Sequence, residues 1–135
     1  MHLNQTRFNQ LTKYSTWGTH YIADLWGVDF DLLNDAKFLI ESMETCIINA
    51  GAKVLDVIHH KFEPNGVTVL LLLSESHFSI HTYPEDGYAS IDCYTCGTTV
   101  KTDQAIDSMI DLLKPSYDDV MYIQRGEKGG MYGRD

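Results

Sequence analysis

The stretch LLLLSESHFSIHTYPEDGYASIDCYTCG, residues 70–97, decides the fold of this chain. Pro84–Gly87 is a turn by composition, and it separates two segments that have the pattern of strands. The segment after it, Tyr88–Tyr94, alternates polar and apolar residues as a half-exposed strand does. We expect it to run antiparallel to the segment before the turn. That earlier segment carries serine and histidine inside a strand-like run, which indicates a function.

Four further segments are predicted to be strands. Val67–Leu73 leads into the stretch above, and Glu63–Gly66 joins it to Val54–His60 through a Pro-Asn-Gly turn. These two strands therefore form a hairpin. His20–Trp26 alternates like a half-buried strand, and Asp118–Gln124 supplies the last one.

Two helices are predicted between these strands. The first follows Asn34, a plausible N-cap, and ends before Gly51, after an acidic turn at Gly27–Asp31. Its apolar residues recur one turn apart, at Leu39, Met43 and Ile47. The second helix is capped by Thr102 and stopped by Pro115. Its apolar face consists of Ala105, Ile106, Met109, Ile110 and Leu113. Helices on one face of a largely antiparallel sheet make a two-layer α+β sandwich.

Composition excludes several classes of function. A formal net charge of -9 and a pI near 4.9, with no basic cluster, oppose binding to nucleic acid or an anionic membrane. The N-terminal residues lack the apolar core of a signal peptide, and the longest aliphatic run, Val67–Leu73, is too short to cross a bilayer. Three cysteines, spaced unlike a secreted disulfide framework, agree with a reducing compartment. We expect a cytoplasmic protein with one domain at 18–125, a flexible arm at 1–17 and a tail at 126–135.

The histidine and cysteine spacing also resembles a zinc-ligand pattern. Three residues separate His77 from His81, and two separate Cys93 from Cys96. In a strand, four residues span about 13 Å, so the histidines would share a face but stand too far apart for one metal. The cysteines would point to opposite faces. A structural zinc site and a redox disulfide between Cys93 and Cys96 therefore stay as minor alternatives, and no metal is expected.

The run SESHFSIHTYPEDGYASIDCYTCG closely resembles the processing and active-site region of the prokaryotic S-adenosylmethionine decarboxylases, and the similarity covers about residues 18–125. These enzymes make a pyruvoyl group from one of their own serines, which is Ser76 in this sequence. The resemblance implies a zymogen that cuts itself between Glu75 and Ser76, giving a β chain of residues 1–75 and an α chain of residues 76–135. It also implies the same α+β fold and a homodimer with active sites at its interface.

The resemblance implies a lyase that decarboxylates S-adenosylmethionine. Amino-acid decarboxylation needs an electrophilic carbonyl that forms a Schiff base with the substrate amine, because no side chain is a good electron sink. A pyruvoyl group derived from Ser76 is such a carbonyl and stays covalently attached to the chain. The product would supply aminopropyl groups for polyamine biosynthesis, including spermidine biosynthesis.

Making this group from a serine needs a nucleophilic hydroxyl, a general base and hydrogen-bond donors for the oxyanion. Ser76, His81 and Thr68 are the candidates. Ser76 and His81 are five residues apart and would face opposite ways in an unbroken strand. Either a turn or bulge interrupts residues 74–77, or the base acts from elsewhere.

The resemblance assigns roles to individual residues. His81 matches the histidine that assists processing, and Cys96 matches the cysteine that protonates the substrate carbon after carbon dioxide leaves. Phe62 matches the aromatic residue that stacks on adenine, and Glu85 matches the acid that binds the ribose hydroxyls. Thr68 stands where many relatives carry a serine that helps the acyl shift. No role is assigned to His59, His60 and His77.

Two other functions stay open. The pyruvoyl chemistry is indifferent to the rest of the substrate, so the enzyme could decarboxylate ornithine or arginine. An unprocessed homologue could instead bind a nucleoside or regulate an active partner by heterodimerising. Phe62 and Glu85 favour S-adenosylmethionine, because a stacking aromatic ring and a carboxylate suit a nucleoside, whereas ornithine has no flat ring.

Overall fold

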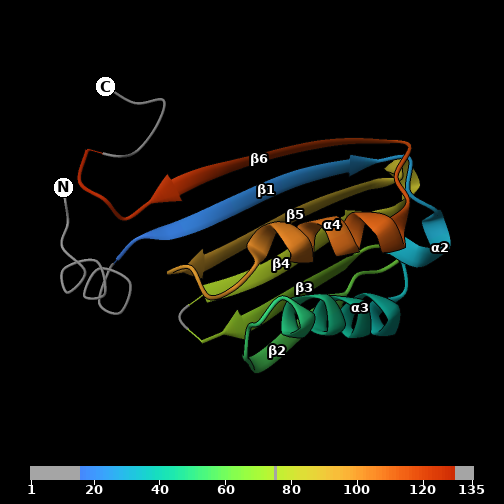
Figure 1. Ribbon diagram of the computed structural model, residues 1–135. Helices are drawn as coiled ribbons and strands as arrows, with labels where there is room; N and C mark the ends of the chain where they lie inside the picture. The colour runs from blue at the N-terminus through green and yellow to red at the C-terminus, as the bar shows by residue number, and fades with distance from the viewer. Residues whose placement is uncertain (1–15, 75, 130–135) are drawn as a thin grey trace.

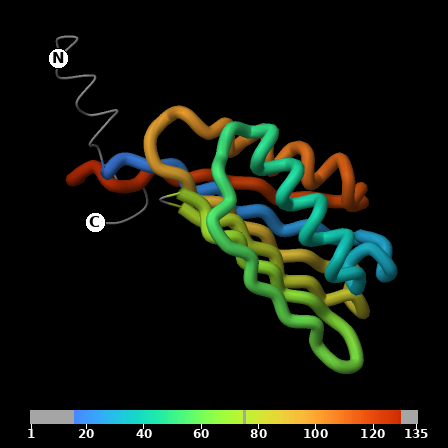
Figure 2. Tube along the Cα trace, turned by 90° about the horizontal axis from the view of Figure 1, so that it is seen from below, coloured from blue at the N-terminus to red at the C-terminus, as the bar shows by residue number. Residues whose placement is uncertain are grey.

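The computed structural model describes residues 16–74 and 76–129, which form an antiparallel sheet with helices on one side (Figure 1). The strands are β1 (Gly18–Trp26), β2 (Val54–Lys61), β3 (Val67–Leu73), β4 (Ser76–Tyr83), β5 (Tyr88–Cys96) and β6 (Tyr117–Arg125). The helices are α2 (Phe30–Leu33), α3 (Ala36–Asn49), α4 (Thr102–Leu113) and a 3₁₀ turn, Pro84–Asp86. The strand order is β2-β3-β4-β5-β1-β6, and neighbouring strands are antiparallel. Helices α3 and α4 lie on the same face (Figure 2), which confirms the two-layer α+β sandwich.

The predicted strands are present, with ends that differ by at most two residues. Alternation is strict in β3 and β5, each of which buries every second side chain. The hairpin of β2 and β3 is confirmed, as is the antiparallel pairing of β5 with β4. The six-stranded sheet therefore follows from the pattern of the sequence.

The predicted N-caps were wrong, because neighbouring residues compete for the same role, whereas Gly51 directly follows the C-cap of α3 with a positive φ, as predicted. Asp35, not Asn34, caps α3, and its Oδ1 accepts a hydrogen bond from the Phe38 amide at 3.0 Å. The Asn34 Oδ1 instead accepts from the Gly66 amide at 2.9 Å, which ties the helix entry to the β2–β3 turn. Thr102 is the first residue of α4 and does not cap it.

The acidic segment after β1 also differs from the prediction of a simple turn. Asp29 caps the short helix α2, and its Oδ2 accepts from the Leu32 amide at 3.3 Å. The helix buries Leu33 completely, and the burial of this apolar side chain stabilises a helical turn where a simple turn was predicted. The segment closes the end of the sheet near β5, where the Val28 amide donates to the Gly87 carbonyl at 3.0 Å.

The core lies between the sheet and the helices. Alternate residues of β3 point into it, namely Val67, Val69, Leu71 and Leu73. The helices contribute Leu39, Met43 and Ile47 from α3, and Ala105, Ile106, Met109 and Leu113 from α4. Each fully buried aliphatic side chain contributes about 1.5–3 kcal/mol by leaving water. The predicted apolar faces are confirmed, although Ile110 is only half-buried.

We call the other side of the sheet the open face, because no helix in the described ranges covers it. It carries the alternate strand residues that point away from the core, and several are large and apolar. Their exposed fractions are 61% for Ile58, 42% for Leu70, 53% for Leu72 and 55% for Met121. Ile58 and Leu70 are paired across β2 and β3 beside Leu72, and a contiguous exposed apolar patch is typical of an interaction surface.

The register gives the sheet two distinct ends. At one, which we call the Ser76 end, Leu73 pairs with Ser76 and Gly18 pairs with Cys96. At the other, the Tyr83 end, Tyr83 pairs with Tyr88. Strand β4 runs the length of the sheet between them, about 23 Å for its eight residues.

The predicted arm and tail fall mainly on residues 1–15 and 130–135, which lie outside the described part. Within that part, the Thr16 hydroxyl donates a hydrogen bond to the Gly126 carbonyl at 2.5 Å. The residues just before β1 are therefore in contact with the residues just after β6. The helices that the structure describes are all too short or too polar to span a membrane.

Candidate functional site

Ser76 is the first residue of β4, directly after the connection from β3. Its Oγ donates a hydrogen bond to the carbonyl of Ser74 at 3.3 Å, and the residue is half-buried. Only Ser74 and Glu75 separate β3 from β4 in the sequence, and Leu73 pairs with Ser76 across that connection. The expected cleavage point therefore lies at a tight hairpin. Glu75 itself falls outside the described residues.

Cys96 ends β5 at the same end of the sheet, and its side chain is half-buried on the open face. Tyr94, two residues earlier, shares that face, where burial and then the charge of Cys96 and a hydrogen bond with it raise the pKa of Tyr94. The Arg125 guanidinium lies over the Tyr94 ring, 4.9 Å from its centroid. Ser76 and Cys96 thus lie at the same end of the sheet, but Ser76 pairs with the buried Leu73, so its side chain projects from the helix side of the sheet and that of Cys96 from the open face.

Cys93 faces the opposite way, as the alternation predicted. It is fully buried against the helices, and burial, with a smaller contribution from the charge of Asp92, raises the pKa of its thiol to about 12. None of Cys46, Cys93 and Cys96 forms a disulfide. The redox disulfide between Cys93 and Cys96 is therefore not formed, and strand geometry explains why.

A second group of predicted residues lies at the Tyr83 end. Thr68 and His81 are paired across β3 and β4, and Thr68 Oγ1 lies 3.0 Å from His81 Nδ1 on the open face. Phe62 follows the end of β2, with its ring 4.5 Å from that of His60. Glu85 is in the 3₁₀ turn that follows β4. These residues surround one end of the sheet and offer a hydroxyl, an imidazole, an aromatic ring and a carboxylate.

The two groups are not brought together within one chain. Strand β4 is continuous from Ser76 through His81, so five residues place their side chains on opposite faces and about 16 Å apart. The hairpin turn precedes Ser76 and does not interrupt the strand between the two residues. Of the two options from the sequence, the structure favours the second, a base that acts from elsewhere.

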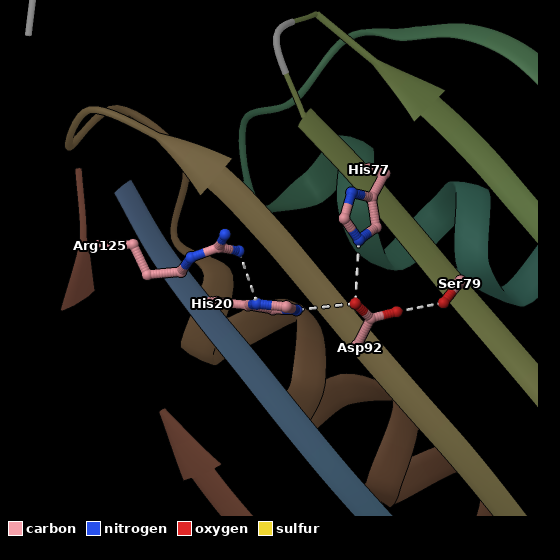
Figure 3. Close-up of polar contacts among 5 residues, drawn as sticks. All are labelled: His20, His77, Ser79, Asp92 and Arg125. Carbon is pink, nitrogen blue, oxygen red and sulfur yellow. Dashed lines mark hydrogen bonds and ion pairs between the residues drawn. The ribbon is translucent and has the colours of Figure 1, made fainter. Parts of the chain in front are cut away.

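One constellation on the open face was missed in the sequence. We call it the polar cluster, and it consists of His20, His77, Ser79, Asp92 and Arg125 (Figure 3). His20 Nε2 lies 2.7 Å and His77 Nε2 lies 2.9 Å from the same Asp92 oxygen, Oδ2. Ser79 Oγ donates to Oδ1 of that carboxylate, and Arg125 Nη1 lies 3.2 Å from His20 Nδ1.

Hydrogen bonding controls the charge of this cluster. Burial alone would raise the pKa of Asp92, but the hydrogen bonds from Ser79, His77 and His20 together lower it below its ordinary value. Asp92 is therefore a carboxylate, and each of its oxygens has a donor. No pattern in one strand reveals this, because His20 and Asp92 are 72 residues apart in sequence.

The polar cluster has the composition of a metal site, since one ligand atom each from His20, His77 and Asp92 lie within 4.8 Å of one another. The proton positions oppose that reading. The Arg125 guanidinium can only donate, so His20 Nδ1 accepts and its Nε2 carries the proton that reaches Asp92. A nitrogen that carries a proton has no lone pair for a metal. His81, the other residue of the spacing noted in the sequence, pairs with Ser90 and lies outside the cluster.

Comparisons with known proteins identify relatives of the whole described domain. A family model described as S-adenosylmethionine decarboxylase matches residues 19–126. A protein of Bacillus cereus named S-adenosylmethionine decarboxylase proenzyme 2 is 56% identical over 117 residues, which cover 87% of this chain and 93% of the relative. An S-adenosylmethionine decarboxylase proenzyme of Brevibacillus brevis is 58% identical over 107 residues, covering 76% of this chain and 77% of the relative.

Solved structures agree with the fold. The crystal structure of the adenosylmethionine decarboxylase from Aquifex aeolicus superimposes with a TM-score of 0.78 at 37% identity, covering 84% of this chain and 93% of that one. The Trypanosoma brucei AdoMetDC monomer has a TM-score of 0.59 at 14% identity, covering 90% of this chain and 59% of that one, and supports the fold alone.

The two thiols of β5 are predicted to differ in reactivity. Because the pKa of Cys93 is about 12, its thiol should react with iodoacetamide at least about 100-fold more slowly in the native protein than in the unfolded chain. Cys96, on the open face, should be modified first. Alkylation at mildly alkaline pH with peptide mass spectrometry measures both rates in one sample. Equal native rates for Cys93 and Cys96 would contradict the assignment of their faces.

Proposed function

Because the chain belongs to the S-adenosylmethionine decarboxylase family, we propose that it is a proenzyme that cuts itself between Glu75 and Ser76 and then decarboxylates S-adenosylmethionine. One observation carries the residue assignment. Ser76 begins a strand that pairs with β3 on one side and, from His77 onward, with β5 on the other. The chain can therefore be cut before Ser76 while both flanking strands stay in the sheet.

The cut follows from the chemistry of a serine ester. The Ser76 hydroxyl oxygen attacks the Glu75 carbonyl carbon, and the peptide bond is replaced by an ester while its nitrogen becomes a free amine. Removal of the acidic α-hydrogen of Ser76 then expels the Glu75 carboxylate and leaves dehydroalanine. Water hydrolyses this residue, and ammonia leaves as the pyruvoyl group forms. Each step needs a base or acid close to residue 76.

The fit of residue 76 to a pyruvoyl group can be judged from its surroundings. Its side chain is half-buried next to the β3–β4 turn, and Cys96 is the last residue of β5 at the same end of the sheet. When formed, the group supplies the electron sink that decarboxylation needs. Cys96 then holds the proton that returns to the substrate carbon, and its thiol lies beside Tyr94 at the same end of the sheet as residue 76.

A second copy of the chain supplies the distant residues. A homodimer formed through the open faces, with its twofold axis across the strands, sets the Ser76 end of one copy against the Tyr83 end of the other. Each site then takes Ser76 and Cys96 from one protomer, and Thr68 and His81 from its partner. The exposed apolar side chains of the open face support this pairing, because an obligate interface is apolar.

The Tyr83 end provides the binding groups for the substrate. Thr68 and His81, 3.0 Å apart, form a hydroxyl–imidazole pair that can move a proton or donate to an oxyanion. Phe62 is 45% exposed, so its ring has a face free for an adenine. Glu85 offers a carboxylate to the ribose hydroxyls. A chain with a net charge of -9 also favours a substrate that carries a positive sulfonium.

Cleavage is the first test. Intact-mass measurement of the purified protein should find two fragments, residues 1–75 and 76–135, the second with a pyruvoyl terminus. Ser76→Ala should remain one chain of 15.3 kDa, because no ester can form. Cys96→Ala should still be cut, since its role comes after cleavage, and is the matched control. A wild-type chain that stays whole after long incubation is incompatible with the proposal.

Complementation tests whether each site needs two protomers. Ser76→Ala and His81→Ala should each be inactive, but co-expression should restore about a quarter of wild-type activity, since half of randomly formed dimers are mixed and each has one intact site. Co-expression of Ser76→Ala with Cys96→Ala should give no such recovery, because one protomer supplies both Ser76 and Cys96 to each site. Failure of the first pair to recover would place the whole site within one protomer.

Substrate choice is measured by release of labelled carbon dioxide. S-adenosylmethionine should be decarboxylated, with ornithine and arginine unreactive. Phe62→Ala should raise KM by about tenfold with little change in kcat, because stacking on a base is worth about 1–3 kcal/mol. Phe62→Tyr keeps the ring and serves as the control. Release of carbon dioxide from ornithine or arginine alone would contradict the proposed substrate but not the pyruvoyl mechanism. A cut protein that releases carbon dioxide from none of the three would favour a binding or regulatory role.

A further inference from the structure

The polar cluster holds two of the first four residues of β4. His77 and Ser79 both point to the open face, and both donate to the carboxylate of Asp92 on β5. His20 brings in β1 on the other side of β5, and Arg125 brings in β6 (Figure 3). The Asp92 carboxylate on β5 therefore links the start of β4 to β1 by hydrogen bonds between side chains.

The position of this tie is specific. His77 directly follows Ser76, and a connection of only Ser74 and Glu75 holds the start of β4 beside β3 in the intact chain. So short a connection restricts the strand end strongly. Cleavage before Ser76, which this inference takes from the proposed function, removes that restriction. Residue 76 then becomes a chain end, and chain ends fray.

After cleavage, the backbone ladders to β3 and β5 remain, and side chains add to them at the start of β4. On the core side, Phe78 is completely buried. On the open face, the anchor is Asp92, whose bonds to His77 and Ser79 are charge-assisted and hence about twice as strong as neutral ones. The backbone of His77 pairs with Leu72 and Tyr94, and its side chain is 45% exposed, so the hydrogen bond to Asp92 is the main fixed point of the side chain.

We propose that the His20–Asp92–His77 cluster positions the cut end of β4, so that the group made from Ser76 stays in place once the β3–β4 connection is broken. The keto carbon made from Ser76 Cα is joined to the backbone nitrogen of His77 through a single atom, the original carbonyl carbon of Ser76. Fraying of His77 therefore displaces the reacting atom directly. A displacement of about 1 Å lowers the rate by about 100-fold in a preorganised site. These residues act through the backbone and do not touch the reacting atoms.

Hydrogen exchange measures the effect directly. Peptides covering residues 76–83 are compared by mass spectrometry in the cut protein and in uncut Ser76→Ala. In the cut protein, Asp92→Asn and His77→Ala should speed exchange of the amides at 77–80 by at least about tenfold, the cost of losing a charge-assisted hydrogen bond. In the Ser76→Ala background, where the hairpin is intact, the same changes should have an effect of less than about twofold. The cut variants should also lose kcat while keeping KM.

Two control variants separate this role from a general loss of stability. His77→Gln keeps an N–H that can reach Asp92 and should restore most of the protection. Asp24→Asn removes another open-face carboxylate, which accepts from the Tyr88 hydroxyl at 2.7 Å, and should leave residues 77–80 unchanged. If Asp92→Asn does not fold, His77→Ala carries the test, because His77 lies half-exposed at the surface.

The outcomes are distinguishable from failure of the proposed function. A wild-type chain that is never cut refutes cleavage and removes the premise. A wild-type chain that is cut, with unchanged exchange in cut His77→Ala, overturns the positioning role alone. Equal acceleration in cut and uncut backgrounds also overturns it, because the cluster would then stabilise the sheet without regard to the cut.

Discussion

The antiparallel pairing of β4 with β3 on one side and β5 on the other is the constraint from which the site follows. A strand paired on both sides cannot bulge or turn without breaking two ladders, so its side chains alternate strictly. Ser76 and His81 therefore stand on opposite faces and near opposite ends. The proposed chemistry, which uses both, is for this reason assigned to a site shared between two copies of the chain. The same rigidity gives each half of the site a fixed geometry.

The open face combines an apolar surface with a charged centre. Leu70 and Leu72 of β3 lie exposed beside the strand that carries His77 and Ser79. A carboxylate is tolerable at such a surface only when its hydrogen bonds are complete, because a half-satisfied polar group is costly once water is removed. Asp92 meets this condition within a single chain. Another protein surface can therefore cover the polar cluster without breaking its hydrogen bonds.

Much of the fold could be predicted from the sequence, because its signals are local. The alternation in β5 placed Cys93 and Cys96 on opposite faces, and the spacing of Leu39, Met43 and Ile47 identified the buried side of α3. Helix caps were harder, since Asn34 and Asp35 are equally suited to the role. Only the contact of Asn34 with Gly66, in a turn over thirty residues away, decides between them.

The members of the candidate site came from the resemblance, and their roles stay predictions. The five-residue spacing of Ser76 and His81 already indicated opposite faces in an unbroken strand, and β4 is such a strand. The polar cluster escaped because its hydrogen bonds depend on the register of β1 against β5, which pairs His20 with Tyr94 and so brings it near Asp92. Long-range register is set by the whole sheet and leaves no local pattern.

The strand order has a consequence for how the two pieces of a cut chain stay together. Residues before Ser76 supply β1, β2 and β3, while residues after it supply β4, β5 and β6. Yet β1 lies between β5 and β6, and β3 pairs with β4. The fragments are interlocked, because β1 of the first is inserted into the sheet of the second. They can separate only if β1 loses both of its neighbours, so the polypeptide must reach its final topology before it is cut, and afterwards it behaves as one body held by three strand ladders.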